Sequence, residues 1–264
     1  MPATLKNLLE TALLPLGSTM YVYGGGWDPL DCGAGKSACS FGLSPAWRRF
    51  FEEQDASYDF REHLYERDNG LDCSGYVGWL LYQVLAEGRD RGYVMKAALM
   101  AQAFAEEGWG KWIPRCNMRE HRPGDLMSTE GHVYLSLGEC ADGSVLLIHA
   151  SPPGVMLSGT VTPQGEDASL AAALAKKILA EYYPQWYYRY PSCVRGISYL
   201  RDYDGMRWDL RGKGVLTDEE GYAIMSAEEL MAVLYGERSF GHEEGNASQK
   251  TESFRSADFG GGEA

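Results

Sequence analysis

Hydrophobic side chains after Asp72 recur at the spacing of an α-helix. Five of them, Val77, Leu80, Leu81, Val84 and Leu85, fall at i, i+3, i+4, i+7 and i+8 and share one helical face. Asp72 stands where an N-cap residue belongs. We therefore predict a helix that begins next to residue 73. Further helices are expected over residues 93–107 and 168–181, with a short amphipathic one within residues 1–17.

The pattern changes to β-type segments after the Arg122-Pro123-Gly124-Asp125 turn. Four short apolar segments follow, at 126–128, 132–137, 145–149 and 155–157, and Gly- and Pro-containing turns separate them. This arrangement predicts an antiparallel meander. We expect the tyrosine-rich residues 186–200 to form a closing strand, residues 217–221 a hairpin and residues 227–235 a short helix.

Three segments lie outside this regular pattern. Residues 27–70 form a long irregular stretch, whose aromatic part from 47 to 65 could hold a helix. Because loops of this length in compact domains usually serve function, we expect an insertion that roofs a cleft. Residues 1–200 would form the main domain and 201–240 a small C-terminal appendage. Residues 241–264 have little to bury and should be a disordered tail.

Composition narrows the possible partners. The chain has 264 residues, of which 45% are hydrophobic, enough to bury a core. It carries 24 Lys and Arg against 37 Asp and Glu, a formal charge of −13, which argues against general affinity for nucleic acid or an anionic membrane. No signal peptide is apparent, and no apolar stretch is long enough to predict a membrane span.

The six cysteines predict neither a disulfide framework nor a metal centre. They stand at positions 32, 39, 73, 116, 140 and 193, in a chain too long to need disulfide staples. No Cys-x-x-Cys pair occurs, and the surroundings of Cys32 and Cys39 lack two further close ligands. We expect no metal and no cofactor, and the redox state of the other cysteines stays open.

Cys73 is placed where a thiol can become a nucleophile. The sequence Leu71-Asp72-Cys73-Ser74-Gly75 puts it in the first turn of the predicted helix, where unpaired N–H groups and the helix dipole favour a thiolate. A thiolate is what acyl transfer needs, and Gly75 would leave room for a substrate at the helix end. The alternative is a buried structural cysteine, a common state for free thiols.

Two histidines strengthen the catalytic interpretation. His132 begins one predicted strand and His149 lies on the next, so adjacent antiparallel strands can bring their imidazoles together. His132 would then act as the base for Cys73, and His149 would fix its tautomer and stabilise its charged form. The alternative is a pair of packing or surface histidines. The remaining histidines, to which we assign no catalytic role, are His63, His121 and His242.

Five motifs in order resemble the NlpC-type cell-wall cysteine peptidases, which are papain-like bacterial enzymes. They are Tyr-Val-Tyr-Gly-Gly (21–25), Asp-Cys-Ser-Gly-Tyr-Val (72–77), Arg-Pro-Gly-Asp-Leu (122–126), Gly-His-Val-Tyr-Leu (131–135) and Ile-His-Ala-Ser-Pro-Pro-Gly-Val (148–155). The match spans about residues 10 to 200. It implies an α+β, papain-like fold in which the helix that bears the nucleophile packs on an antiparallel sheet. It also implies hydrolysis of an amide in peptidoglycan stem peptides, typically the link between D-γ-glutamate and a diamino acid.

The resemblance also implies roles for single residues. Cys73 matches the nucleophile, His132 the general base and His149 the polar orienting residue. Tyr21 matches the family tyrosine near the thiol, with an oxyanion or substrate role. Asp72 and Ser74 flank the nucleophile as in relatives where such neighbours help bind a free amino terminus. For Asp72 an N-cap role is an equally good interpretation, compatible with the first.

The chain departs from the family pattern in several respects. The segment between Gly26 and Asp72 is far longer than the usual connector, so the cleft would be reshaped and the substrate is less defined than the reaction. Secreted relatives carry a signal peptide and a basic wall-binding repeat. Neither is evident here, so the location is open between cell wall and cytoplasm. The strong acidity makes a soluble muropeptide at least as good a substrate as the intact wall.

Two other functions stay open at this point, and so does the oligomeric state. The same three residues would serve an amidase or thioesterase on another substrate. A catalytically silent domain that binds a wall fragment or a protein is the alternative from a different class.

Overall fold

The computed structural model describes residues 3–30, 33–85, 91–212 and 214–236. The chain divides into two units, Met1–Leu230 and Met231–Ala264, and the fold described below is that of the first. The tail predicted over 241–264 lies outside the described residues. No helix in the described ranges has the length and apolar character to cross a membrane.

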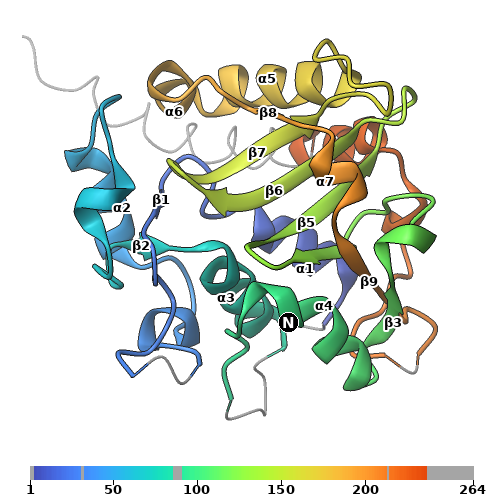
Figure 1. Cartoon of the computed structure of the whole chain (residues 1–264), viewed down its shortest axis with the longest axis horizontal. Coiled ribbons are helices and arrows are strands. Elements are labelled where there is room, and N and C mark those ends of the chain that lie inside the picture. Colours follow the sequence, from blue (N-terminus) through green and yellow to red (C-terminus); the bar gives the residue numbers. More distant parts are fainter. Residues whose placement is uncertain (1–2, 31–32, 86–90, 213, 237–264) are drawn as a thin grey trace, which may run out of the picture. The chain divides into compact units, whose positions relative to one another are not determined.

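A curled, half-barrel sheet forms the centre of the first unit (Figure 1). Its main path runs β2-β1-β7-β6-β5-β4-β9-β3, with β8 paired to β7. The prediction of an antiparallel meander is confirmed for β4 to β7, because each of these strands pairs antiparallel with the next. The strands are β1 (Met20–Tyr21), β2 (Gly70–Leu71), β3 (Gly110–Ile113), β4 (Leu126–Thr129), β5 (His132–Glu139), β6 (Val145–Ser151), β7 (Gly154–Thr160), β8 (Val194–Arg195) and β9 (Asp204–Trp208).

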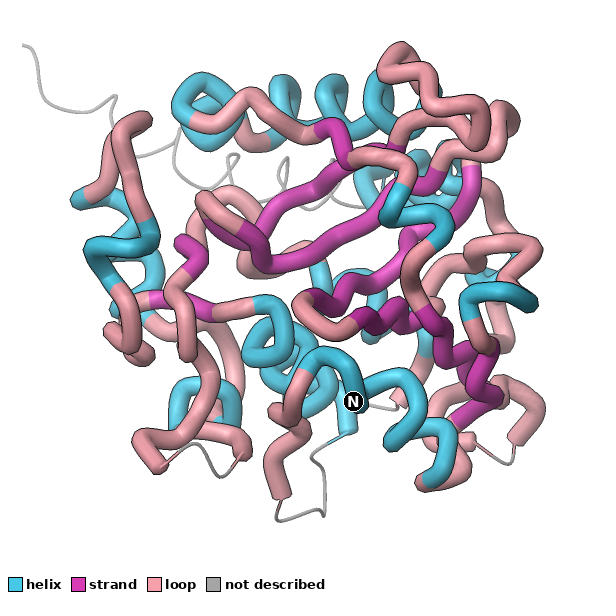
Figure 2. Tube along the Cα trace, in the orientation of Figure 1, coloured by secondary structure: helices cyan, strands magenta, loops and turns pink. Residues whose placement is uncertain are grey.

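Helices flank the strands, which makes the described part a mixed α/β structure compatible with the expected α+β class. Figure 2 shows them surrounding the strands, and in Figure 1 α3 and α4 lie below the sheet and α5 above it. Helix α3 packs on β5 and β6, and α5 on β7. The α-helices are α1 (Leu5–Ala12), α2 (Pro45–Glu53), α3 (Cys73–Leu85), α4 (Ala97–Glu106), α5 (Leu170–Tyr182), α6 (Pro184–Arg189) and α7 (Ser198–Arg201). Residues 227–236 are also helical.

Helix α3 is an interior helix. The sequence predicts one apolar face, but every residue of α3 except Tyr82 and Gln83 is buried. Trp79 and Tyr76 are fully buried, and the Tyr76 hydroxyl donates to the carbonyl of Ala12 on α1 at 2.8 Å. Since the helix is enclosed nearly all round, its first residue, Cys73, is held in a fixed position against the sheet.

Three segments differ from their predicted structure. Residues 186–200 form α6, the short strand β8 and α7 in place of one strand. Pro184 in the first turn favours a helix, and Trp186 and Tyr190, four residues apart, are both buried. Helix α4 begins at Ala97, four residues later than expected, because residues 91–96 are not helical.

Residues 217–221 form no hairpin in the described part of the chain. Thr217 instead makes an isolated parallel bridge to Thr4, and the Asp218 carboxylate accepts the backbone N–H groups of Tyr222 and Ala223. Within the expected appendage 201–240, β9 pairs antiparallel with both β3 and β4. This segment therefore supplies a strand to the sheet.

Candidate active site

Cys73 lies at the junction between β2 and α3. Strand β2 runs parallel to β1, and one residue later the helix begins. Asp72 makes the N-cap hydrogen bond, because its Oδ1 accepts the Gly75 N–H at 2.7 Å. The same carboxylate accepts the Ser74 hydroxyl at 2.9 Å and the Gly24 N–H at 3.2 Å. Asp72 is thus bonded to groups of its own chain and fixes the first helical turn.

The glycines of the two motifs pack directly against each other. A Cβ on Gly75 would stand 1.9 Å from the carbonyl oxygen of Gly25, and one on Gly26, which has a φ of +91°, would stand 2.6 Å from the Gly75 Cα. The expectation that Gly75 leaves room for a substrate is therefore wrong. That space is filled by the 24–26 loop, whose Gly25 carbonyl also accepts the Asp72 N–H at 3.1 Å.

The two imidazoles predicted to cooperate lie on adjacent strands and meet. Leu135 of β5 pairs with Ile148 of β6, so His132 and His149 are diagonal neighbours on one face of the sheet. His132 Nε2 is 2.7 Å from His149 Nδ1. A ring nitrogen at this distance is engaged in a hydrogen bond, which leaves Nδ1 as the nitrogen of His132 available to another group.

Arg195 and Ser158 contact the far side of His149, and sequence reasoning missed both. His149 is fully buried, and its Nε2 lies 3.2 Å from the Ser158 hydroxyl and 3.2 Å from Arg195 Nε. Ser158 comes from β7 and Arg195 from β8. The only signal available for Ser158 was the alternation of side chains along a strand. Arg195 belongs to no motif and lies where we expected an uninterrupted strand.

Tyrosine rings, which we call the tyrosine wall, pack against the histidine pair. Tyr199 packs edge-on against both imidazoles with centroids 5.8 Å from each, and the Tyr203 ring is 6.4 Å from that of His132. The Tyr134 hydroxyl donates to the Tyr199 carbonyl at 2.7 Å and ties this wall to β5. These aromatic rings reduce the access of water to the imidazoles.

The Cys73 sulfur lies beside the start of β5. The backbone N–H of Val133, the residue after His132, acts on the thiol to lower its pKa, as do the N–H groups of Ser74 and of Cys73 itself. Within the described residues, no hydrogen bond joins the thiol to either imidazole. Hydrogen bonds of this kind are often long in unliganded enzymes and shorten only when substrate binds.

Burial dominates the electrostatics of the site. Cys73 is 8% exposed, and burial, with the nearby Asp72 carboxylate, raises the pKa of its thiol to about 12. Burial and the charge of Arg195 lower the pKa of His132 to about 4, and that of His149 falls well below its usual value for the same causes. The helix start was expected to favour a thiolate, but burial and the carboxylate outweigh it. The resting pair is a neutral thiol and a neutral imidazole.

The segment 27–70 contacts the other predicted site residues. The Trp27 indole donates to the Ser74 hydroxyl at 3.1 Å, which links the segment to the helix start. The Tyr58 hydroxyl donates to the Tyr21 carbonyl at 2.6 Å, and Phe60 packs edge-on against the Tyr21 ring. The Tyr21 hydroxyl bonds no other described residue, so it can donate to a ligand.

A cavity of about 610 Å³ lies along this segment. Trp27, Tyr65 and Arg67 are among its lining residues, and polar and charged side chains make up most of the rest. Because Trp27 both lines the cavity and bonds Ser74, the cavity lies next to the start of α3.

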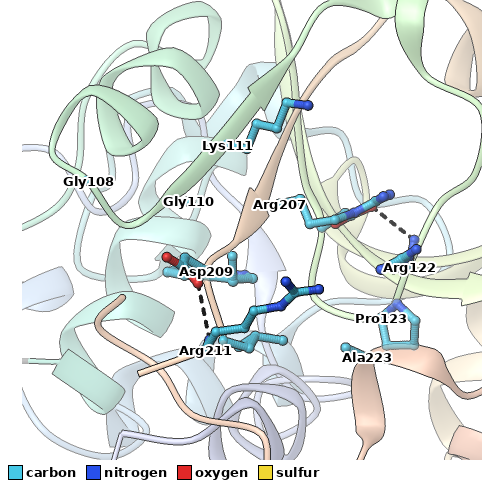
Figure 3. Close-up of a pocket in the computed structure, with 12 residues that line it drawn as sticks. Gly108, Gly110, Lys111, Arg122, Pro123, Arg207, Asp209, Arg211 and Ala223 are labelled. Carbon is cyan, nitrogen blue, oxygen red and sulfur yellow. Dashed lines mark hydrogen bonds and ion pairs between the residues drawn. The ribbon is translucent and has the colours of Figure 1, made fainter. Parts of the chain in front are cut away.

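A second cavity, of about 520 Å³, is lined by another part of the fold (Figure 3). Its lining includes the Arg207 and Arg122 side chains, and both arginines are paired with acidic groups. None of the predicted catalytic residues lines it. Within the described ranges, no group of three or more His, Cys, Asp and Glu side chains is placed to hold a metal ion.

Comparison with family models, with curated proteins and with solved structures yields no match for this chain.

Proposed function

We propose that this protein is a cysteine hydrolase of the NlpC type that cleaves an amide in peptidoglycan stem peptides. The observation that carries the proposal is the 2.7 Å contact between His132 Nε2 and His149 Nδ1, beside a thiol that begins an interior helix. A base backed by a second polar group next to a thiol is the arrangement that nucleophilic acyl transfer requires. The family resemblance supplies the substrate, the link between D-γ-glutamate and a diamino acid.

The reaction would begin with proton transfer from Cys73 to His132 Nδ1. The thiolate attacks the amide carbonyl, and the N–H groups at the start of α3, with the Tyr21 hydroxyl, stabilise the oxyanion. Protonated His132 then gives its proton to the leaving amine, and water hydrolyses the thioester. Aromatic rings around the imidazoles keep this charge separation away from bulk water and so strengthen the hydrogen bonds that support it.

The decisive experiment removes the nucleophile. Cys73→Ala should abolish release of cleaved peptides from a muropeptide pool, because it removes the sulfur that would form the thioester. Cys140→Ala is the matched control, since it removes another buried thiol and should retain activity. Mass spectrometry of the products identifies the bond that is cut. Peptide release by Cys73→Ala at the parent rate would refute the proposal, and products from another amide or a thioester would reassign the substrate.

The raised thiol pKa favours one competing function, a catalytically silent module that binds a wall fragment or a protein. Such a module needs no reactive sulfur. Incubation of native protein with muropeptide, followed by an acid quench and intact-mass measurement, separates the two: an enzyme gives a covalent acyl adduct on Cys73, whereas a silent site gives none.

A further inference from the structure

The proton on His149 can be located from its neighbours. The N–H at Arg195 Nε points at His149 Nε2 from 3.2 Å, and a guanidinium has only donors. Nε2 must therefore present its lone pair. Because a neutral imidazole carries a single N–H, the His149 proton is on Nδ1.

This fixes the proton on His132 as well. His149 Nδ1–H donates across 2.7 Å to His132 Nε2, which accordingly accepts. A neutral His132 then carries its own proton on Nδ1, the nitrogen available to the thiol. In this arrangement His132 has no lone pair with which to take the proton of Cys73.

Catalysis needs the opposite arrangement. His132 must donate from Nε2 to His149 Nδ1, both when it is neutral with Nδ1 free and when it is protonated. His149 then carries its proton on Nε2. This N–H would face the N–H of Arg195 Nε, and two donors cannot form a hydrogen bond with each other. Ser158 Oγ, 3.2 Å from the same nitrogen, can accept that proton in a hydrogen bond once Arg195 has moved.

We propose that Arg195 is a positioning residue that holds the imidazole pair in the unreactive proton arrangement, and that the site becomes active when the guanidinium leaves His149 and Ser158 becomes the acceptor. The change creates no net charge. His149 Nδ1 passes its proton to His132 Nε2, His132 Nδ1 releases one to water, and water returns one to His149 Nε2. This inference rests on the proposed function, because it assigns His132 as the base for Cys73.

The other contacts of Arg195 suit a group that moves. Its Nη2 lies 2.8 Å from the thioether sulfur of Met156 and its Nη1 3.2 Å from the Val194 carbonyl. Across the described residues no carboxylate pairs with it, in a chain that carries 37 acidic side chains. Arg195 is only partly buried, so its guanidinium can turn toward solvent without a large movement of the backbone.

The tautomers can be measured without substrate. In ¹⁵N-histidine-labelled protein at pH 7, the parent should show His149 and His132 each protonated on Nδ1. Arg195→Met should move both protons to Nε2, and Arg195→Lys, which keeps a cationic donor, should retain the parent pattern. A parent with the His149 proton on Nε2 would overturn the inference, and this measurement does not depend on any variant folding.

Thiol reactivity gives a second readout, because Cys73 gains a base only in the active arrangement. Alkylation of Cys73 at pH 7 should be about tenfold or more faster in Arg195→Met than in the parent, the change that one pKa unit produces. Ser158→Ala should slow labelling in the Arg195→Met background, because it removes the acceptor for the His149 Nε2 proton. Arg201→Met is the matched control, since Arg201 is exposed and its side chain donates to the Pro163 carbonyl, away from the imidazoles.

Other charged and titratable groups near the thiol stay constant across these variants, so the change reports on Arg195. They are Asp72, Tyr21, Tyr199 and Tyr203. Equal labelling of Arg195→Met and parent would overturn the inference. Failure of the parent to hydrolyse muropeptides would count against the proposed function alone, because neither readout uses a substrate.

Discussion

Two arginines on the same sheet are held in opposite ways. Arg207 of β9 is bound by carboxylates, with its Nη2 2.6 Å from Asp125 Oδ2 and its Nη1 3.0 Å from Glu120 Oε1. Arg195 of β8 is bound by an imidazole, a thioether and a carbonyl. Burial alone would lower both pKa values. At Arg207 the hydrogen bonds and charge of Asp125 and Glu120 outweigh burial and raise the pKa, whereas at Arg195 burial prevails and the pKa falls. Arg207 therefore supports the fold through its ion pairs, whereas Arg195 is held by weaker contacts and can leave His149.

The largest expected contrast is in stability. Arg207→Met should lower the free energy of unfolding by about 3–5 kcal/mol, because it leaves the buried Asp125 carboxylate without its arginine partner. Arg195→Met should change the free energy of unfolding by no more than about 1 kcal/mol, since it removes weak hydrogen bonds and a poorly solvated charge together. Urea denaturation of the two variants and the parent measures both values.

The double variant Asp125→Leu with Arg207→Met sharpens this contrast. It removes both charges and should be more stable than Arg207→Met alone, as is common for buried ion pairs replaced by apolar groups. If Arg195→Met and Arg207→Met lowered the free energy of unfolding equally, both arginines would support the fold to the same extent and the contrast between them would be wrong.

The next contrast concerns acid. The folded-state pKa values of His132 and His149 lie below the unfolded value near 6.5, so the unfolded chain binds more protons as the pH falls from 6.5 to 4. The free energy of unfolding should therefore drop over this interval, by about 1–3 kcal/mol for this pair. Burial raises the pKa of Asp72 to about 6, which acts in the opposite sense over part of the same range.

Arg195→Met should lessen this acid sensitivity, because its charge opposes protonation of both rings. Urea titrations at pH 7 and 4.5 on the parent, Arg195→Met and His149→Gln provide the comparison. If the free energy of unfolding fell by the same amount between pH 7 and 4.5 in the parent and in Arg195→Met, desolvation alone would set the two histidine pKa values.

The smallest effect is expected at the rim of the Arg207 cluster. Glu120→Gln removes a half-exposed carboxylate that contacts Arg122 at 2.6 Å as well as Arg207. Exposed ion pairs are screened, so the cost should be about 0–1 kcal/mol and should shrink further in high salt. A loss comparable to that of Arg207→Met would place the stabilising charge on Glu120, not on Asp125.

The sequence was informative where a local pattern determines the structure. Helix α3 follows from apolar spacing and the Asp72 cap, and the meander follows from turns between short β-type segments. The same patterns placed His132 and His149 on neighbouring strands and suggested their roles, which the resemblance also implies.

What the sequence could not predict depends on long-range packing. Arg195 reaches His149 only because β8 pairs parallel with β7, and two residues are too few to reveal a strand. The tyrosine-rich region has composition suited to either a strand or a helix, and the burial of Trp186 and Tyr190 decided for a helix. The thiolate expectation did not include burial, which can be judged only once the neighbours of Cys73 are known.

The close approach of the 24–26 loop to Gly75 has a consequence for how this protein can change. The chain departs at Gly26 and returns at Gly70, whose strand pairs with the one just before the departure point. The residues between leave and rejoin the sheet on adjacent strands, and they also pack on α3, where the Trp47 and Trp79 rings meet, and on α6, where Arg189 donates to the Phe51 and Gln54 carbonyls. Changes confined to exposed positions of this segment, such as Glu66 and Asp68 at its cavity, would alter what the protein recognises while the reacting atom keeps its position, so new specificity can arise here without rebuilding the helix beneath.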